Sequence, residues 1–263
     1  MSSRQEAILR ELNLYPLWRL RDAPVPAQGS LDGGRADTQQ AATDIATQSA
    51  MGIVQPVLSK ACPEPGRRAE GLNPPHASAL DWPELKVIVR DCTACKLRAG
   101  CTQTVFGVGD EKADWLFVGE GPGADEDAQG QPFVGQAGKL LDNMLVAIKL
   151  KRGTNVYITN IVKCRPPGNR VPEADEIAQC LPYLARQIKL VQPKLIVALG
   201  KTAATSLLGR DSTLANLRGM AHNYQGIPLI ITYHPAYLLR APLEKAKAWQ
   251  DLCLAVETMR RQL

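Results

Sequence analysis

The chain has 263 residues, of which 31 are Lys or Arg and 26 are Asp or Glu, so its formal net charge is +5. This length suits one large domain or two small ones, and the mild basic excess permits nucleic-acid binding without requiring it. No apolar run approaches the roughly 18 residues that a membrane-spanning helix needs, and the charged residues 1–21 lack the apolar stretch of a secretory signal. We therefore expect a cytoplasmic protein, in which the seven cysteines favour metal binding over disulfides.

The first third of the chain predicts little packed structure. Apolar residues recur over residues 5–20, so residues 1–21 are predicted to form a short N-terminal helix, either loosely held or docked on a protein partner. Residues 22–80 are rich in Ala, Gly, Pro, Gln, Ser and Thr, and they cannot bury enough apolar surface to offset the entropy of ordering. We predict a flexible linker there, followed by one domain over residues 81–263.

Beyond the linker, the chain is predicted to alternate strands and helices. Four short apolar runs suit parallel strands buried on both faces: Trp115–Val118, Val156–Thr159, Leu195–Leu199 and Leu229–Thr232. Helices are predicted from Asp81, burying Leu85, Val87, Ile88 and Val89, and over Gln136–Leu150, Glu173–Val191 and Lys201–Leu208. This alternation predicts an α/β fold, a three-layer sandwich with a central four-stranded parallel sheet and helices on both faces.

One distinctive loop follows each predicted strand. In chain order these loops are Gly119–Gly123 (GEGPG), Asn160–Pro167, Gly200–Thr202 (GKT) and His234–Tyr237 (HPAY). Ligands of open parallel sheets bind beyond the carboxyl ends of the strands, so the four loops predict a single binding mouth. A nucleoside triphosphatase fits poorly, because Glu120 would repel a phosphate and the GKT turn lacks the upstream Gly of a Walker loop.

Four cysteines form a second pattern. Cys92 and Cys95 stand at C-x2-C spacing, and Cys164 and Cys180 lie far downstream with fifteen residues between them. Four thiolates suit either tetrahedral zinc or a cubane iron–sulfur cluster. The long second spacing favours a cluster, and four separate buried thiols are the plain alternative. We leave Cys101 out of the ligand set, because its spacing to the first pair is less regular.

From about Trp82 to the C-terminus, the chain resembles the family 4 uracil-DNA glycosylases. The matching motifs are Gly119–Gly123 continued through Glu126-Asp127 and Gly130–Gly138, then Asn160–Arg170, then His234–Leu239. Gly121 stands where the family often has Ala, and Ala236 where it usually has Ser. The resemblance implies a [4Fe-4S] cluster on Cys92, Cys95, Cys164 and Cys180. It also implies a monofunctional uracil-DNA glycosylase, which flips uracil out of DNA and leaves an abasic site for base excision repair.

The resemblance implies catalytic roles for two residues. His234 would donate to uracil O2, where negative charge gathers as the glycosidic bond breaks. Glu120 would face the sugar, where it either holds the attacking water or offsets the oxocarbenium charge. A His-Pro turn with a purely structural role is the plain alternative for His234.

Five residues are expected to shape the uracil pocket together with these two. Phe133 would stack on the base, and Asn160 would read the edge that separates uracil from cytosine. Gly119 and Gly121 would let the backbone approach the base, and Glu126 would crowd the position of the thymine methyl group. A hydrophobic loop anchor and a turn-capping Asn are the plain alternatives for Phe133 and Asn160.

The same loops predict contacts with DNA. Phosphate-binding residues are expected at Lys163, Arg165, Arg170 and Arg240, and a wedge between stacked bases at Leu238 and Leu239. A solvated basic loop and a helix start that buries two leucines are the alternatives. The expected partner is uracil-containing DNA, bound by a monomer. The rival functions are a DNA-binding redox sensor without enzymatic activity and a zinc-stabilised relative with altered base specificity.

Overall fold

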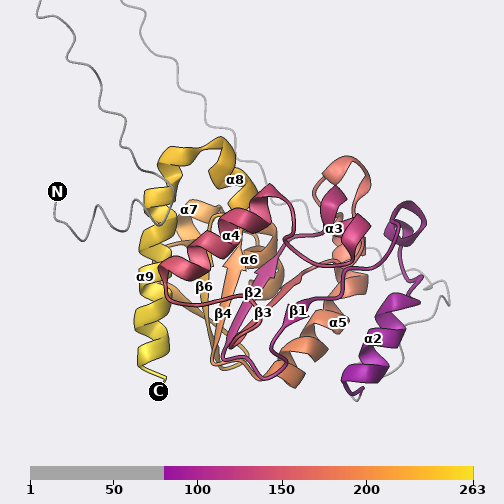
Figure 1. The fold of residues 1–263 in the computed structure, drawn as a ribbon, viewed down its shortest axis with the longest axis horizontal. Helices are drawn as coiled ribbons and strands as arrows, with labels where there is room; N and C mark the ends of the chain where they lie inside the picture. The colour runs from indigo at the N-terminus through magenta and orange to yellow at the C-terminus, as the bar shows by residue number, and fades with distance from the viewer. Residues whose placement is uncertain (1–79, 263) are drawn as a thin grey trace, which may run out of the picture. The chain divides into compact units, whose positions relative to one another are not determined.

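The structure, a computed structural model, describes residues 80–262 and shows a six-stranded mixed sheet with helices on both faces (Figure 1). The strands are β1 (Val108–Gly109), β2 (Trp115–Gly119), β3 (Val156–Asn160), β4 (Leu195–Leu199), β5 (Ala221–Tyr224) and β6 (Ile227–Thr232). The α-helices are α2 (Trp82–Arg90), α3 (Ala124–Gln129), α4 (Gln136–Ala147), α5 (Ala174–Val191), α6 (Lys201–Leu208), α7 (Leu214–Leu217), α8 (Pro235–Arg240) and α9 (Lys245–Arg260). Three 3-10 turns complete this part: η2 (Lys96–Gly100), η3 (Pro167–Asn169) and η4 (Pro242–Glu244).

The helix expected over residues 1–21 and nearly all of the linker expected over residues 22–80 lie outside the described residues. Within the described range, no helix combines the length and the apolar character needed to cross a membrane.

The α/β sandwich is confirmed, but the sheet is larger than the four strands expected. Its order is β1-β3-β2-β4-β6-β5, and the four predicted strands form the parallel centre. β1 and β5 add one antiparallel strand at each edge. The prediction missed them because β1 has two residues and β5 alternates exposed with half-buried positions. Neither strand has the continuous apolar run of a strand buried on both faces.

Alternate residues of the central strands face opposite helical layers. Leu116 and Val118 of β2 pack in the cluster that α2, α5, α6 and α7 cover. Trp115 and Phe117 pack on the other face, under α4 and α9. A third, smaller cluster joins α4, α8 and α9 and so anchors α8 beside the sheet.

Helix α2 starts where the sequence predicts it. Asp81 and Glu84 form a capping box, in which each side chain accepts from the other residue's backbone N–H. Leu85 and Val89 are buried as expected, but Val87 is 48% exposed and the prediction that it is buried was wrong. Residues four apart share one helix face, and Val87 lies between them on the opposite side.

The strand register brings the four predicted loops to one edge of the sheet. Gly119 at the end of β2 pairs with Asn160 at the end of β3. Leu199 at the end of β4 pairs with Thr232 at the end of β6. Because all four strands are parallel, the loops that follow them leave the sheet at this edge.

Candidate functional site

A cleft of about 480 Å³ opens at this edge of the sheet. Its lining includes eight of the residues singled out from the sequence: Glu120, Gly121, Glu126, Phe133, Asn160, Arg170, His234 and Arg240. The ring centroids of Phe133 and His234 are 5.5 Å apart. The residues expected to stack on, read and polarise a base are therefore brought together.

Gly119 does not itself line the cleft, but it is packed against two residues that do. A Cβ atom placed there would lie 2.4 Å from Oδ1 of Asn160 and 2.5 Å from Cζ of Phe133. Asn160 itself is 1% exposed, and its Oδ1 has no hydrogen-bond partner. An unpaired buried acceptor typically costs 1–3 kcal/mol, so this oxygen is placed to receive a donor from a ligand.

The Phe133 loop is held in a strained conformation. Phe133 has φ 56°, a left-handed backbone that side-chain-bearing residues rarely adopt. Oε1 of Glu126 accepts from the backbone N–H groups of Val134 and Gly135 at 2.9 and 3.1 Å. From the other side, Arg152 donates to the carbonyl oxygens of Pro132 and Phe133 at 2.9 and 2.8 Å. Two side chains therefore clamp the loop that carries the Phe133 ring.

Sequence reasoning did not identify Arg152, and it gave Glu126 a different task. Arg152 follows α4 in a short turn without a recognisable motif, and Asp142 anchors it at 2.8 Å. Glu126 lines the cleft, but its carboxylate accepts hydrogen bonds from backbone N–H groups, including that of Gly123. Its expected contact with a thymine methyl group stays a prediction.

His234 is a neutral imidazole with a defined tautomer. Its Nδ1 accepts from the backbone N–H of Ala236 at 3.2 Å, which caps the start of α8. The proton of the neutral ring therefore sits on Nε2. Burial, with a smaller contribution from the charge of Arg240, lowers the pKa of His234 to about 4, although Glu126 partly opposes the shift. At neutral pH the ring offers an Nε2–H donor without carrying a charge.

The GKT turn supports the site rather than binding phosphate. Gly200 has φ 94°, and a Cβ atom on it would lie 3.0 Å from Cβ of His234, so glycine gives the histidine room. The hydroxyl of Thr202 donates to Oε2 of Glu120 and orients that carboxylate at the cleft. Thr202 was missed because its partner lies 82 positions away in the sequence.

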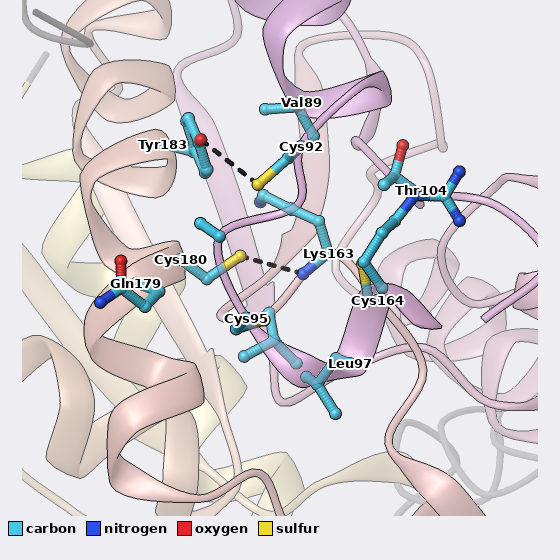
Figure 2. Close-up of a pocket in the computed structure, with 13 residues that line it drawn as sticks. Val89, Cys92, Cys95, Leu97, Thr104, Lys163, Cys164, Gln179, Cys180 and Tyr183 are labelled. Atoms are coloured by element: carbon cyan, nitrogen blue, oxygen red, sulfur yellow. Dashed lines mark hydrogen bonds between the residues drawn. The ribbon is translucent and has the colours of Figure 1, made fainter. Parts of the chain in front are cut away.

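The four predicted cysteine ligands line one cavity (Figure 2). Cys92 and Cys95 follow α2, Cys164 follows β3, and Cys180 lies in α5. In the described range, no three His, Cys, Asp or Glu side chains are placed to share one metal ion. A zinc ion draws each sulfur to about 2.3 Å, whereas a [4Fe-4S] cluster spreads four thiolates around several irons. The donor type, number and common cavity fit a cluster.

Hydrogen-bond donors are aimed at two of the sulfurs. The backbone N–H of Lys163 donates to Sγ of Cys180 at 3.3 Å, and the hydroxyl of Tyr183 donates to Sγ of Cys92 at 3.4 Å. Burial raises the pKa of Cys180 to about 11, and it also raises that of Cys95 and Cys164. Such thiols ionise when they ligate a metal, and the donors then stabilise the thiolates.

The structure does not present Lys163 for the phosphate contact that the sequence predicted. Its side chain is 1% exposed, and its Nζ donates to Oγ1 of Thr159, the carbonyl of Asn160 and Oε1 of Gln187 at 2.6, 2.8 and 2.7 Å. Burial lowers its pKa to about 8. All three ammonium protons are used inside the protein, so Lys163 braces the end of β3 instead of meeting DNA.

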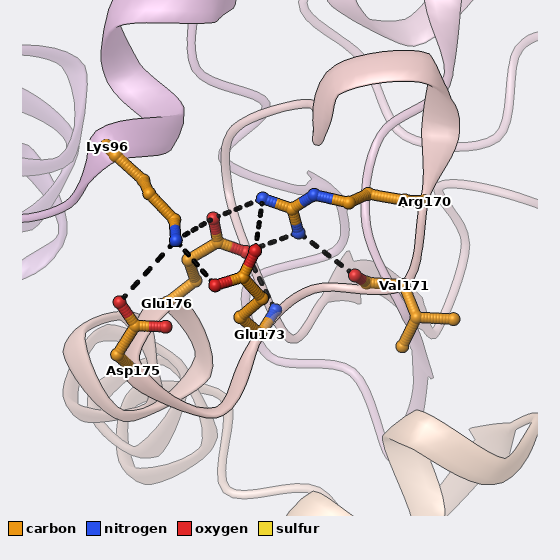
Figure 3. A network of polar contacts seen from close by, with 6 residues as sticks. All are labelled: Lys96, Arg170, Val171, Glu173, Asp175 and Glu176. Atoms are coloured by element: carbon orange, nitrogen blue, oxygen red, sulfur yellow. Dashed lines mark hydrogen bonds and ion pairs between the residues drawn. The ribbon is translucent and has the colours of Figure 1, made fainter.

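Arg170 lines the cleft but is paired with carboxylates (Figure 3). Its guanidinium donates to both oxygens of Glu176 at 2.8 and 2.6 Å, and it lies 3.2 Å from Glu173. Glu176 is fully buried, and Arg170 lowers its pKa to about 2. Lys96 reaches the same carboxylates, so the network joins segments next to Cys95 and Cys164 to the start of α5. Any phosphate contact of Arg170 would compete with Glu176 and stays a prediction.

The remaining DNA-contact candidates divide by exposure. Leu238 is 1% exposed and packs between α4 and α9, so the structure does not present it for the insertion between bases that the sequence predicted. Leu239 is 46% exposed, and Arg240 lines the cleft, so both stay available to DNA. Arg165 is hydrogen-bonded to Asn169 at 2.8 Å and lies outside the cleft lining.

Known proteins match this sequence over most of the domain. A family model described as the uracil DNA glycosylase superfamily matches residues 106–253. The type-4 uracil-DNA glycosylase of Pyrobaculum aerophilum is 40% identical over 185 residues, which cover 66% of this chain and 93% of that protein. The chain belongs to the type-4 uracil-DNA glycosylase family.

Two further relatives of this chain are also named type-4 uracil-DNA glycosylases. The protein from Archaeoglobus fulgidus is 43% identical over 162 residues, covering 59% of this chain and 81% of the relative. The protein from Sulfurisphaera tokodaii is 46% identical over 167 residues, covering 60% of this chain and 76% of the relative. The whole cleft lining falls within the residues that match the superfamily, whereas Cys92 and Cys95 precede them.

Proposed function

We propose that this chain hydrolyses the bond between uracil and deoxyribose in DNA, releasing free uracil and leaving an abasic site for base excision repair. Family membership supports this activity. The observation that carries it is the meeting of the Phe133 ring, the unpartnered Oδ1 of Asn160 and the His234 imidazole in one cleft. A base stacked in a duplex cannot reach such a cleft, so the uracil must be extruded.

Asn160 supplies the recognition of uracil. Its Oδ1 accepts from uracil N3–H, and its amide donates to O4. Cytosine presents the opposite polarity at both atoms and would leave buried groups unpaired, which supports discrimination of roughly 10⁴-fold. Phe133 stacks on the base face, while Gly119 and Gly121 keep the backbone clear of it. Glu126, beside them, is the candidate for excluding the thymine methyl group.

His234 stabilises the departing base. As the glycosidic bond breaks, negative charge gathers on uracil O2, and the Nε2–H of the neutral imidazole donates to it. A preorganised donor of this kind contributes roughly 2.7–4 kcal/mol to lowering the barrier. The low pKa of His234 suits this role, because a neutral donor stays in place without giving up its proton.

Glu120 acts on the sugar side of the cleft. Held by Thr202, its carboxylate either orients the attacking water or offsets the oxocarbenium charge. Replacing Glu120 by Gln separates the two roles, because an amide can still hold a water but carries no charge. Among the described residues that line the cleft there is no lysine, which supports simple hydrolysis without a lyase step through a lysine Schiff base.

Cys92, Cys95, Cys164 and Cys180 would hold a [4Fe-4S] cluster. When bound, the cluster supplies structural bracing, because hydrolysis moves no electrons. The four cysteines and the network around Glu176 tie the segments before η2, after β3 and within α5 to one another. The Asn160 end of β3 lies next to this brace through Lys163.

The proposal is tested with a uracil-containing oligonucleotide and an assay of abasic-site formation. The parent should release uracil, whereas Asn160→Ala and His234→Ala should each lose most of the activity. Asn216→Ala is the matched control, because this exposed asparagine of α7 lies outside the cleft. If both cleft variants release uracil as fast as the parent, the assignment of the site is wrong.

A further inference from the structure

Tyr237 places an aromatic ring at the mouth of the cleft. It lies in the first turn of α8, three residues after His234, and it lines the cleft. The residue is 39% exposed although it is aromatic. The uracil-binding roles described above do not use it, because Phe133 already supplies the stacking face inside the cleft.

The ring of Tyr237 is supported from behind by a second aromatic ring. Tyr233 stacks on it with a centroid distance of 5.1 Å and an angle of 26° between the ring planes. The guanidinium carbon of Arg218 lies 4.2 Å from the centroid of Tyr233, within cation–π range. Arg218, Tyr233 and Tyr237 thus form a stacked column that ends at the cleft.

The base of this column is fixed in the protein. Arg218 donates to Oδ2 of the buried Asp251 at 2.7 Å and to the carbonyl of Lys247 at 2.6 Å. A ring with such backing loses little further freedom when a ligand stacks on it. An exposed ring without backing would lose its rotamer freedom at that moment.

Two arginines share the cleft lining with this ring. Arg240 and Arg170 line the same cleft as Tyr237, and Arg170 is paired with Glu176. A flat apolar ring bordered by arginine is the pattern by which proteins hold single-stranded nucleic acid, with bases on aromatic faces and phosphates on cations. A base that leaves the stack also uncovers the face of its neighbour in the strand, so an unstacked base face is present when the cleft is filled.

We propose that Tyr237 forms a second base-binding subsite, on which a nucleobase adjacent to the extruded uracil stacks. The proposal rests on the proposed function, because the uracil in the cleft brings its neighbour to this position. Stacking uses the face of the base and not its hydrogen-bonding edge. The subsite should therefore accept any of the four bases and should not need the Tyr237 hydroxyl.

The first test compares Tyr237→Leu with Tyr237→Phe on a single-stranded uracil oligonucleotide under single-turnover conditions. Tyr237→Leu should raise the half-saturating enzyme concentration by roughly 5- to 100-fold, as expected for one lost base–aromatic stack. The rate at saturation should stay close to that of the parent. Tyr237→Phe keeps the ring face and should behave as the parent within about twofold.

The second test removes the base instead of the ring. A tetrahydrofuran residue replaces the nucleotide on the 5′ side of the uracil in one substrate and on the 3′ side in another. For the parent, one of these two substrates should raise the half-saturating enzyme concentration as much as Tyr237→Leu does. For Tyr237→Leu, the same substrate should cause no further increase. The measurement on the parent protein does not depend on any variant, so this test remains usable even if Tyr237→Leu folds poorly.

Two results would overturn the subsite. In the first, neither abasic neighbour changes the half-saturating concentration of the parent. In the second, Tyr237→Leu binds both abasic-neighbour substrates more weakly than the parent by the same factor as it binds the intact substrate. Failure of the proposed function has a different signature, because the parent would then release uracil from none of the substrates. Anisotropy of a labelled oligonucleotide with tetrahydrofuran at the target position measures the same stack without the reaction.

Discussion

Glycine at position 119 shows how one missing side chain creates a binding site. The cleft needs the ring of Phe133 and the amide of Asn160 within reach of the same base, and both side chains approach the Cα of Gly119. Its backbone is ordinary β-strand, so it is steric clearance and not a special φ that requires glycine there. A larger residue would push apart the two groups that we propose to hold the uracil.

We expect Gly119→Ala to reduce uracil release by roughly 10²-fold, because the added methyl group displaces Asn160 or Phe133 from its productive position. Gly100→Ala is the matched control, since a Cβ atom there meets nothing within 4 Å. Single-turnover rates on a uracil oligonucleotide measure the effect. Equal rates for the two variants would show that the cleft tolerates the methyl group.

A second prediction at the residue scale concerns the pKa of His234. That pKa is about 4 in the folded chain and about 6.5 in the unfolded chain. Between these values the unfolded chain binds more protons, so the free energy of unfolding falls as the pH falls. From pH 7.5 to 5.5 this group should cost the parent on the order of 1 kcal/mol of stability.

His234→Gln removes that contribution. Urea denaturation at pH 7.5 and 5.5 should therefore show a smaller acid-induced loss of stability in His234→Gln than in the parent. His222→Gln serves as the control, because His222 lies outside the cleft. The same loss in parent and His234→Gln would place the His234 pKa near its ordinary value.

At the scale of elements, the carboxyl end of β3 connects the two sites. Asn160, the proposed reader of the base, stands at the end of the strand, and Cys164 belongs to the cysteine cavity four residues later. Lys163 lies between them, with its side chain on the carbonyl of Asn160 and its backbone N–H on Cys180. Gln187 of α5 also accepts from the Lys163 ammonium. Helix α5 thereby fixes the position of the strand end.

Replacing Lys163 by Met should lower the free energy of unfolding by roughly 3 kcal/mol, because three buried oxygens lose their donor. It should also weaken the preference for uracil, because Asn160 loses the bond on its carbonyl. The measurements are urea denaturation, iron content and uracil release. Lys139→Met, on the exposed side of α4, is the control. A stable variant with unchanged activity would show that Lys163 merely fills space.

At the scale of the whole molecule, the cysteine cavity joins three segments that are distant in sequence. Without a cluster, the segment after α2 is held by the buried side chain of Leu97 and by polar contacts near α5, among them those of Tyr183 and Lys96. We expect the purified protein to contain four irons per chain and the visible absorption of a [4Fe-4S] cluster. Cys180→Ala should lose the iron and melt at a lower temperature.

Cys253→Ala is the matched control for that experiment, since Cys253 is exposed on α9 and lies outside the cavity. It should keep both the iron and the melting temperature. Zinc in place of iron in the parent protein would contradict the cluster and support a zinc-stabilised relative.

The sequence by itself determined the central strands, most helices and the two motif sets. Parallel strands buried on both faces read as continuous apolar runs, and every loop at their carboxyl ends must open at the same edge. The positions of Asn160 and His234 in one cleft follow from that rule, whereas Phe133 lies between α3 and α4 in a loop that Glu126 and Arg152 hold. The edge strands β1 and β5 do not, because a short or half-exposed strand leaves no distinctive pattern.

Only the tertiary structure decided which polar residues face inward. Lys163 stands in a basic run that reads as solvated, yet Thr159 and Gln187 enclose it. Arg152 belongs to no motif, and the GKT turn does not reveal the contact between Thr202 and Glu120, because the partners of both residues lie far away in the sequence. The burial of a side chain depends on which elements pack over it, and local sequence does not contain that information.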